Sequence, residues 1–440
     1  MSGIEMGLLS ILAILGLIWA GMYVPVALGL VSFVGVWFLR GSLEAPVYLL
    51  TLSASNSLED YIFGVIPLFV LMGLLVSRSE LGRDIYEVAN VCLRRVKGGL
   101  GVATVVANAA FAAITGVSIA SASVFTRVSV PEMIRFGYQP RFAVGIVAGS
   151  SVLGMLIPPS VMLIIYAIIT EQSVAAMFKA GIFPGIVLAL AYIIAIVAMA
   201  IFAPDWVGGQ DRKSRDLARA QSGMSVLQMT RKASPLVILV LLVLGGIYGG
   251  VFTPTEAGAV GALGALLIAL IKRRLDRGTL WKVLVETGHI VASILMLIVA
   301  ATMYSRMLAM SGLPNELGEW ISHLDIGLYG LLAIYVMALI VLGTILDTTS
   351  IILIMVPLFL PVMIGYDVDL IWFGIITIVG AEIGLLTPPL GIACYVIKST
   401  LDIESISLAD IFLGAAPFAL IMLLVLILLI AFPSISLVLI

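Results

Sequence analysis

The chain has 440 residues, of which 62% are hydrophobic and only 11% are charged, and its mean hydropathy is +1.22. Soluble domains carry roughly 45–50% apolar and about 25% charged residues, so this composition excludes a soluble globular protein and indicates an integral membrane protein. The formal net charge of −2, with no block of like charge, argues against a nucleic-acid-binding role.

Apolar runs long enough to cross a bilayer follow one another along nearly the whole chain, and a spanning helix needs about 20 such residues. Because the runs are continuous rather than alternating, they predict an all-α polytopic fold and not a β-barrel. The first run lacks a basic leader and a cleavage site, so we expect it to be retained. Ten spans are expected, at 5–20, 23–39, 61–77, 142–169, 180–203, 234–251, 255–271, 284–301, 370–397 and 411–432.

Two further apolar stretches, 99–126 and 327–362, carry Gly, Ser, Thr and Asp near their centres. Inside a membrane, irregular backbone is tolerated only where it is buried in protein or lines a wet cavity. We therefore predict that each stretch forms a re-entrant hairpin of two helices, which enters and leaves the membrane on the same side.

The basic residues set the orientation of these elements, because cytoplasmic loops retain an excess of Lys and Arg. With the N-terminus on the periplasmic side, all of the 23 basic residues except Arg40, Lys179 and Arg306 fall in cytoplasmic segments. The pattern predicts a multi-pass protein of the bacterial inner membrane with a periplasmic N-terminus.

The two halves of the chain match each other. GMYVPVALG from Gly21 matches GVFTPTEAG from Gly250, and GMLIPPS from Gly154 matches GLLTPPL from Gly384, at an offset of about 230 residues. Each half holds five spans and one hairpin, and the odd number of spans inverts the second half relative to the first.

This inverted-topology repeat divides the chain into three parts. The first repeat, 1–203, is expected to hold scaffold helices at 5–77, the hairpin 99–126 and a broken helix at 142–169. A cytoplasmic linker with a surface helix follows at 204–233. The second repeat, 234–440, is expected to hold scaffold helices at 234–301, the hairpin 327–362 and a broken helix at 370–397.

Adjacent prolines interrupt the two predicted broken helices, Pro158-Pro159 in the first and Pro388-Pro389 in the second. A proline inside a helix removes a hydrogen bond and costs about 3 kcal/mol. A full break frees carbonyls and exposes helix ends, whose partial charges suit a cation at one end and an anion at the other. A plain proline kink is the alternative, and the recurrence of the pattern in both halves disfavours it.

The hairpin tips are rich in oxygen donors, which together with freed carbonyls can cage a hard cation. The alternative for a single hydroxyl is helix-to-helix packing. The donors are Ser118, Ser121 and Ser123 at the first tip, and Thr344, Asp347, Thr348, Thr349 and Ser350 at the second.

Two carboxylates within the membrane are singled out, because a charge at the bilayer centre costs at least about 2.5–3.5 kcal/mol unless it is paired, hydrated or ion-bound. Asp347 is predicted to contact sodium or the transported solute. Glu382 is a similar candidate, with a buried partner in the scaffold as its alternative. Glu256 lies near a membrane surface and is assigned a structural role.

Several other functions are disfavoured. No GxxxxGK[ST] pattern is present, so energy must come from an ion gradient or another subunit. Ser118 lies in GVSIA, but neither His289 nor His323 has a catalytic context, so we predict no enzyme and a packed polar role for His289. Cys92 and Cys394 are expected to be small buried hydrophobic residues.

Several segments resemble a known family, the large (DctM-like) membrane subunit of tripartite ATP-independent periplasmic (TRAP) transporters: IPLFVLMGLLVS, GYQPRFAVGIVAGSSVLGMLIPPSVMLIIYA, SVAAMFKAGIFPG, GVFTPTEAGAVGAL and GLLTPPLG. The resemblance spans nearly the whole chain. It implies an elevator mechanism and sodium-coupled import of a small organic acid, with about two sodium ions. It also implies a separate small four-helix membrane subunit and a periplasmic solute-binding protein as partners.

The resemblance also implies positions for the ligands. The sodium ligands would be Gly116, Ser118, Ser121, Ser123, Ser150, Ser151 and Gly154 in the first half, and Gly343, Thr344, Asp347, Thr348, Thr349, Gly380, Gly384 and Thr387 in the second. The substrate would meet Ser118, Asp347, Glu382, Pro158, Pro159, Pro388 and Pro389. Ile157 of the first repeat aligns with Thr387 of the second. Sodium ligation by the first break would therefore depend more on backbone carbonyls.

The main alternative is a self-sufficient sodium–carboxylate symporter of the divalent-anion type. Those carriers typically show paired Ser-Asn-Thr motifs at their hairpins, whereas the tips here are GVSIASAS and GTILDTTS. A channel or a membrane enzyme is disfavoured further. The solute stays open among a C4-dicarboxylate, another carboxylate and a sulfonate, because the binding protein largely sets selectivity in such systems.

Overall fold

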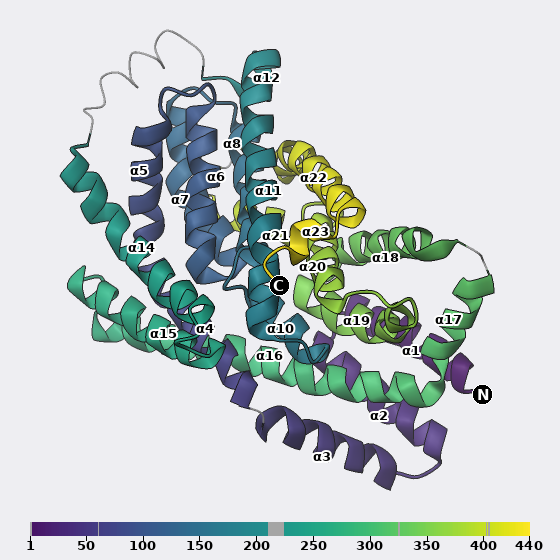
Figure 1. Cartoon of the computed structure of the whole chain (residues 1–440). Helices are drawn as coiled ribbons and strands as arrows, with labels where there is room; N and C mark the ends of the chain where they lie inside the picture. The colour runs from purple at the N-terminus through teal and green to yellow at the C-terminus, as the bar shows by residue number, and fades with distance from the viewer. Residues whose placement is uncertain (1, 60, 210–223, 324–325, 402, 404) are drawn as a thin grey trace.

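The structure is a computed structural model (Figure 1), and it describes residues 2–59, 61–209, 224–323, 326–401, 403 and 405–440. All regular elements of this part of the chain are helices, which confirms the predicted all-α membrane fold. Seven helices in it are long and apolar enough to cross a membrane, and an eighth span is gained if a helix pair bent by 43° is counted as one.

The first half builds a bundle and a hairpin with a broken helix. Its bundle helices are α1 (Gly3–Trp19), α2 (Val24–Arg40), α3 (Glu44–Glu59), the short η1 (Tyr61–Gly64) and α4 (Val65–Arg78). The arm α5 (Leu81–Leu93) leads to α6 (Gly99–Thr115), α7 (Ser118–Arg135), α8 (Pro140–Ser151), α9 (Leu153–Leu156), α10 (Val161–Ile169), α11 (Val174–Phe202) and α12 (Pro204–Val207).

The second half repeats this order. Its bundle helices are α14 (Val226–Tyr248), α15 (Pro254–Ile271) and α16 (Arg277–Ser311), and the arm is α17 (Leu313–His323). The hairpin, the broken helix and the last helices follow as α18 (Gly327–Gly343), α19 (Thr348–Gly365), α20 (Leu370–Leu385), α21 (Ile392–Thr400), α22 (Leu408–Ala431) and α23 (Ser434–Leu437).

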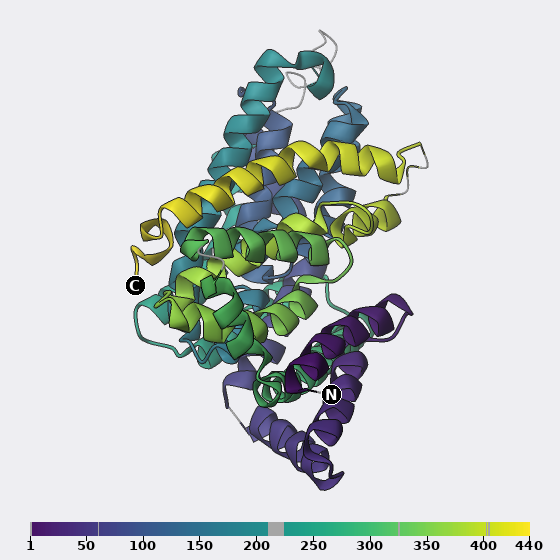
Figure 2. The same ribbon diagram turned by 90° about the vertical axis from the view of Figure 1, so that its right-hand side faces the viewer.

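The helices form two groups. In the scaffold, α16 packs against α2, α3 and α4, and α4 packs against α15. In the second group, which we call the body, α11 and α22 pack on the first hairpin and on both broken helices, and the second hairpin packs on α20 and α10. Figure 2 shows the separation: the N-terminal helices α1–α3 lie at one end of the molecule, and the C-terminal helix α22 crosses the opposite half.

Glycine allows the first broken helix and α22 to approach closely inside the body. A Cβ on Gly145 of α8 would lie 2.1 Å from the carbonyl oxygen of Gly414 on α22, and a Cβ on Gly414 would lie 2.0 Å from the Arg141 carbonyl oxygen. No side chain fits at such a separation, so the closest approach of α8 and α22 requires glycine on both sides. This contact ties the first half of the body to the second.

Four features differ from the sequence-based expectation. α3 was not predicted, and neither were the arms α5 and α17, because hydropathy reports apolar runs and these helices are amphipathic or mixed. α16 extends well beyond the predicted span 284–301 at both ends. The predicted hairpin 99–126 continues to Arg135. Of the predicted linker, residues 210–223 lie outside the described residues, and 226–233 already belong to α14.

Glu256 has the structural role that was predicted for it. Its backbone N–H donates to the Thr253 hydroxyl at 3.3 Å, and its carboxylate accepts from the Thr253 backbone N–H at 2.9 Å. This reciprocal capping box satisfies two donors at the start of α15 and fixes where the helix begins.

Candidate functional site

The first hairpin tip rests directly on the first helix break. α6 ends at Gly116, whose φ of +61° is a conformation that favours glycine, and α7 begins at Ser118. The backbone N–H of Val161 donates to the Gly116 carbonyl oxygen at 3.2 Å. A Cβ on Gly116 would lie 2.4 Å from the Pro159 carbonyl oxygen. We call α6 to α10 the first unit.

The second tip meets the second break in the same way. The backbone N–H of Leu390 donates to the Thr344 carbonyl oxygen at 3.1 Å. A Cβ on Gly384 would lie 2.4 Å from the Cα of Gly343. We call α18 to α21 the second unit. In each half the structure therefore brings together the tip and the break that the sequence pairs with one another.

The first unit holds buried hydroxyls without hydrogen-bond partners. The side-chain oxygens of Ser118, Ser121 and Thr126 are all buried and unpaired. Asn108 of α6 donates from Nδ2 to the Ser150 hydroxyl at 2.6 Å, which leaves its own Oδ1 buried and unpaired. An unpaired polar atom in the interior is costly, so these oxygens are candidates to bind a further group.

The second unit carries two carboxylates at its tip and break instead, Asp347 and Glu382. Asp347 is the N-cap of α19, and its carboxylate accepts from the backbone N–H groups of Thr349 at 3.1 Å and Ser350 at 3.3 Å. The Thr348 hydroxyl donates to Glu382 Oε1 at 2.6 Å. Glu382 is fully buried, and its Oε2 has no partner. No scaffold cation pairs with Glu382 among the described residues.

The remaining predicted ligands surround these tips. Gly154 packs on the Val117 backbone, and Gly380 packs on Leu339. The hydroxyls of Ser151, Thr344 and Thr387 donate to backbone carbonyls of their own helices. The proline pairs differ between the halves: Pro158 and Pro159 are buried, whereas Pro388 and Pro389 are exposed.

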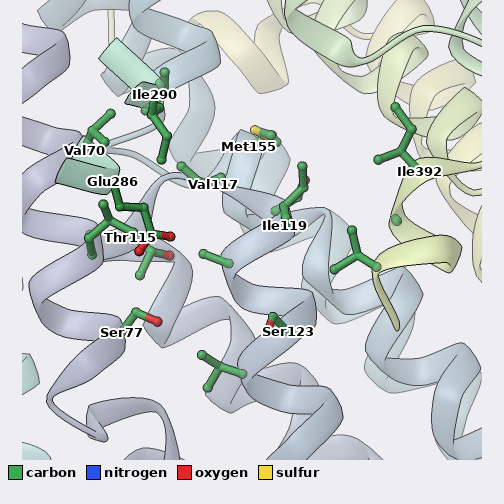
Figure 3. Close-up of a pocket in the computed structure, with 18 of the residues that line it drawn as sticks. Val70, Ser77, Thr115, Val117, Ile119, Ser123, Met155, Glu286, Ile290 and Ile392 are labelled. Atoms are coloured by element: carbon green, nitrogen blue, oxygen red, sulfur yellow. The ribbon is translucent and has the colours of Figure 1, made fainter. Parts of the chain in front are cut away.

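A cavity of about 1040 Å³ connects the two units. It is lined by the first tip and Ser123 of α7, and by Asp347, Thr348 and Thr349 of the second tip. Residues on both sides of each break also line it. Figure 3 shows Val70 and Ser77 of the scaffold helix α4 on one wall, with Ile119 and Ser123 of α7 facing them.

The scaffold closes the cavity opposite the tips. α4 contributes Ser77, and α16 contributes Glu286, His289 and Ser293. At one end the lining includes Arg78, whose side chain is 49% exposed and pairs with Glu286 at 3.1 Å. The cavity thus meets solvent on the side where the basic loops gather.

Three sequence-based predictions are wrong or incomplete here. His289 is exposed and lines the cavity, so it is not a packed polar residue. Cys92 is exposed on α5, whereas Cys394 is buried as expected. Asn108 was not predicted as a site residue, although a lone amide inside the apolar helix α6 was a signal that could have identified it.

The donor set fits a hard monovalent cation. The unpaired atoms are oxygens of hydroxyl, amide and carboxylate groups, which are the ligands that such cations prefer. The described residues contain no cluster of three or more His, Cys, Asp and Glu side chains of the kind that binds transition metals. Sodium fits the chemistry of the tips.

Comparison with known proteins identifies the family. The family model described as "Tripartite ATP-independent periplasmic transporter, DctM component" matches residues 11–435. The C4-dicarboxylate TRAP transporter large permease protein DctM of Pseudomonas aeruginosa is 33% identical over 380 residues, which cover 86% of each chain. The sialic acid TRAP transporter large permease protein SiaM of Vibrio cholerae is 29% identical over 429 residues, which cover 97% of each chain.

The crystal structure of the YdaH transporter of Alcanivorax borkumensis has the same fold, with a TM-score of 0.61 at 15% sequence identity over 89% of this chain and 90% of that one. The apolar helices define a multi-span membrane protein, and the matched family consists of transporter permeases rather than enzymes. Within that class, the chain belongs to the DctM component family, the large permease subunits of TRAP transporters.

Proposed function

We propose that the chain imports a small organic anion together with sodium, as the moving gate of a transporter that receives its solute from a periplasmic binding protein. The observation that carries the proposal is the single cavity that touches both hairpin tips and both helix breaks. Ions held at the tips and a solute held between them would share one compartment, which is the condition for coupling their movement.

The two units are positioned to move together. Thr349 of the second tip lies 3.6 Å from the Met162 sulfur of the first unit, measured from its hydroxyl oxygen. With the packing of α21 on α7, this joins the units into one body. The scaffold wall of the cavity, by contrast, belongs to α4 and α16. These packings support an elevator motion of the body against the scaffold.

Sodium would be held by different donors in the two halves. In the first unit the donors would be the hydroxyls of Ser118 and Ser121 with carbonyls of the break. In the second they would be Asp347 and its neighbours at the tip. A sodium ion beside Asp347 neutralises a carboxylate that would otherwise repel an anionic solute, so ion and solute binding reinforce one another.

The proposed solute is a C4-dicarboxylate or another small carboxylate or sulfonate. The named relatives take C4-dicarboxylate and sialic acid, both of which carry carboxylates. The proposed partners are a separate small membrane subunit and the periplasmic binding protein.

Reconstitution tests the proposal. Proteoliposomes that contain this chain and the small subunit should accumulate radiolabelled solute only when an inward sodium gradient and the liganded binding protein are both supplied. Omitting any one component should reduce uptake to background. Sodium-driven uptake by this chain alone would instead show a self-sufficient symporter, and uptake without sodium would refute the coupling.

A further inference from the structure

One face of α7 lines the cavity. Ile119, Ser123 and Arg127 are four residues apart and all line the cavity, so they project from the same side of the helix. Arg127 lies nine residues beyond Ser118, which at about 1.5 Å per residue places it about 13 Å along the helix from the tip. Arg127 therefore marks the solvent end of this wall.

The other charged residues around this end are already paired. Arg78 pairs with Glu286 at 3.1 Å, Arg83 pairs with Glu87 at 3.1 Å, and Arg274 pairs with Glu80 at 2.8 Å. Arg127 has no carboxylate within ion-pair distance among the described residues. Of the arginines that line the cavity in the described part of the chain, it is the one whose guanidinium stays available.

The surroundings of Arg127 suit an anion. Its cavity neighbours on α7 are the apolar Val124 and Val128, and the scaffold wall nearby offers the Ser77 hydroxyl. A guanidinium carries several N–H donors in a planar fork that matches a carboxylate or a sulfonate. Apolar walls limit hydration, which strengthens a charge-assisted hydrogen bond relative to open water.

The excess of basic residues on one side of the membrane does not by itself explain why Arg127 lines the cavity. Arg135 lies on the same helix, also at the basic side, and satisfies the same excess of positive charge. Both arginines are exposed, but Arg135 does not line the cavity. The chain thus offers a matched pair of arginines on one helix, one inside the cavity and one outside it.

We propose that Arg127 binds the acidic group of the solute at the solvent end of the cavity, as a station between the hairpin tips and the basic side of the membrane. The inference rests on the proposed function, since it assumes that the cavity carries an organic anion. The station would set the affinity for solute that enters from, or leaves to, the basic side.

Anion binding to the purified full-length chain tests the station. The probes are succinate, N-acetylneuraminate and methanesulfonate, with succinamide as a neutral control, and Kd is measured by calorimetry for wild type, Arg127→Gln, Arg127→Lys and Arg135→Gln. We expect Arg127→Gln to raise Kd at least tenfold for one or more of the anions, which is about 1.4 kcal/mol. Arg127→Lys should weaken binding less, and Arg135→Gln should match wild type.

The outcomes separate this inference from the proposed function. If no anion distinguishes wild type from Arg127→Gln, or if Arg135→Gln has an equal effect, the station is refuted whether or not the reconstituted transporter works. If Arg127 determines anion affinity but reconstituted wild type shows no sodium-driven uptake, the station stands and the proposed coupling falls. Unchanged thermal unfolding of Arg127→Gln in detergent ensures that the variant is folded.

Discussion

The first and second units share a backbone plan but differ in charge. In both, a hairpin tip accepts a backbone hydrogen bond from the residues that follow a helix break. When Gly116 is aligned with Gly343, Ser121 corresponds to Thr348, and both hydroxyls are buried. The Thr348 hydroxyl donates to Glu382, whereas Ser121 has no partner. When the breaks are aligned through Gly154 and Gly384, Val152 holds the position that corresponds to Glu382. The repeat thus keeps the backbone geometry of tip and break while changing the polar side chains there.

The largest expected effect concerns Asp347, a carboxylate at the second tip that the first tip lacks. Asp347→Asn should lower sodium-dependent uptake about a hundredfold, because the amide removes the charge that holds the ion. Asn is as good an N-cap as Asp, so α19 should stay intact and thermal unfolding should change little. Sodium dependence equal to wild type in this variant would remove Asp347 from the ion site.

The second-largest effect is expected from a backbone change at the first tip, at Gly116. Gly116→Ala should destabilise the protein by about 2 kcal/mol, because alanine is strained at positive φ and its Cβ would collide with the Pro159 carbonyl. Gly41→Ala is the control, since Gly41 has a φ of +67° with open space around it and should lose only about 1 kcal/mol. Thermal unfolding in detergent gives both values. Equal losses of stability in the two variants would show that the hairpin tip accommodates the added Cβ at no extra cost.

The aligned hydroxyls offer a direct test of the difference between the units. Thr348→Val should cost about 1.5 kcal/mol of stability, because it deprives a buried carboxyl of its one hydrogen bond. Ser121→Ala should be nearly neutral in sodium-free buffer, since its hydroxyl has no partner to lose. Unfolding measurements that reversed this order would contradict the assigned contacts.

The smallest effect concerns how the first unit is attached to the scaffold through α5. Burial alone would raise the pKa of the Glu87 carboxyl, but Lys232 of α14, together with Arg83, brings that pKa below its usual value of 4.5. A lowered pKa stabilises the folded state above pH 4.5, and the benefit is lost as pH falls through the folded-state pKa. Lys232→Met should therefore cost below about 1 kcal/mol at pH 7 and less at pH 4, as followed by thermal unfolding. A pH-independent cost would argue against the ion pair.

Much of this architecture was predictable because it depends on local signals. Paired prolines end helices wherever they occur, and the match between GMLIPPS and GLLTPPL located both breaks. The same comparison of the halves predicted the hydroxyl-rich tips. The structure places each tip on the break of its own half.

The parts that could not be predicted depend on which side of a helix faces which neighbour. The pairing of Thr348 with Glu382 joins residues 34 positions apart and depends on how α19 packs on α20. His289 borders the cavity because α16 presents that face to the hairpins, which no pattern in the apolar run reveals. The amphipathic arm α5 was overlooked because mean hydropathy averages out its two faces.

Sodium binding tests most directly whether the two units are two ion sites. Equilibrium binding of radioactive sodium should be measured on purified wild type, on Asp347→Asn and on the double variant Ser118→Ala/Ser121→Ala. We predict about two ions for wild type and about one for each variant, because each change disables one unit and spares the other. If both variants bind as much sodium as wild type, or if wild type binds none, the tips are not the ion sites and the account is contradicted.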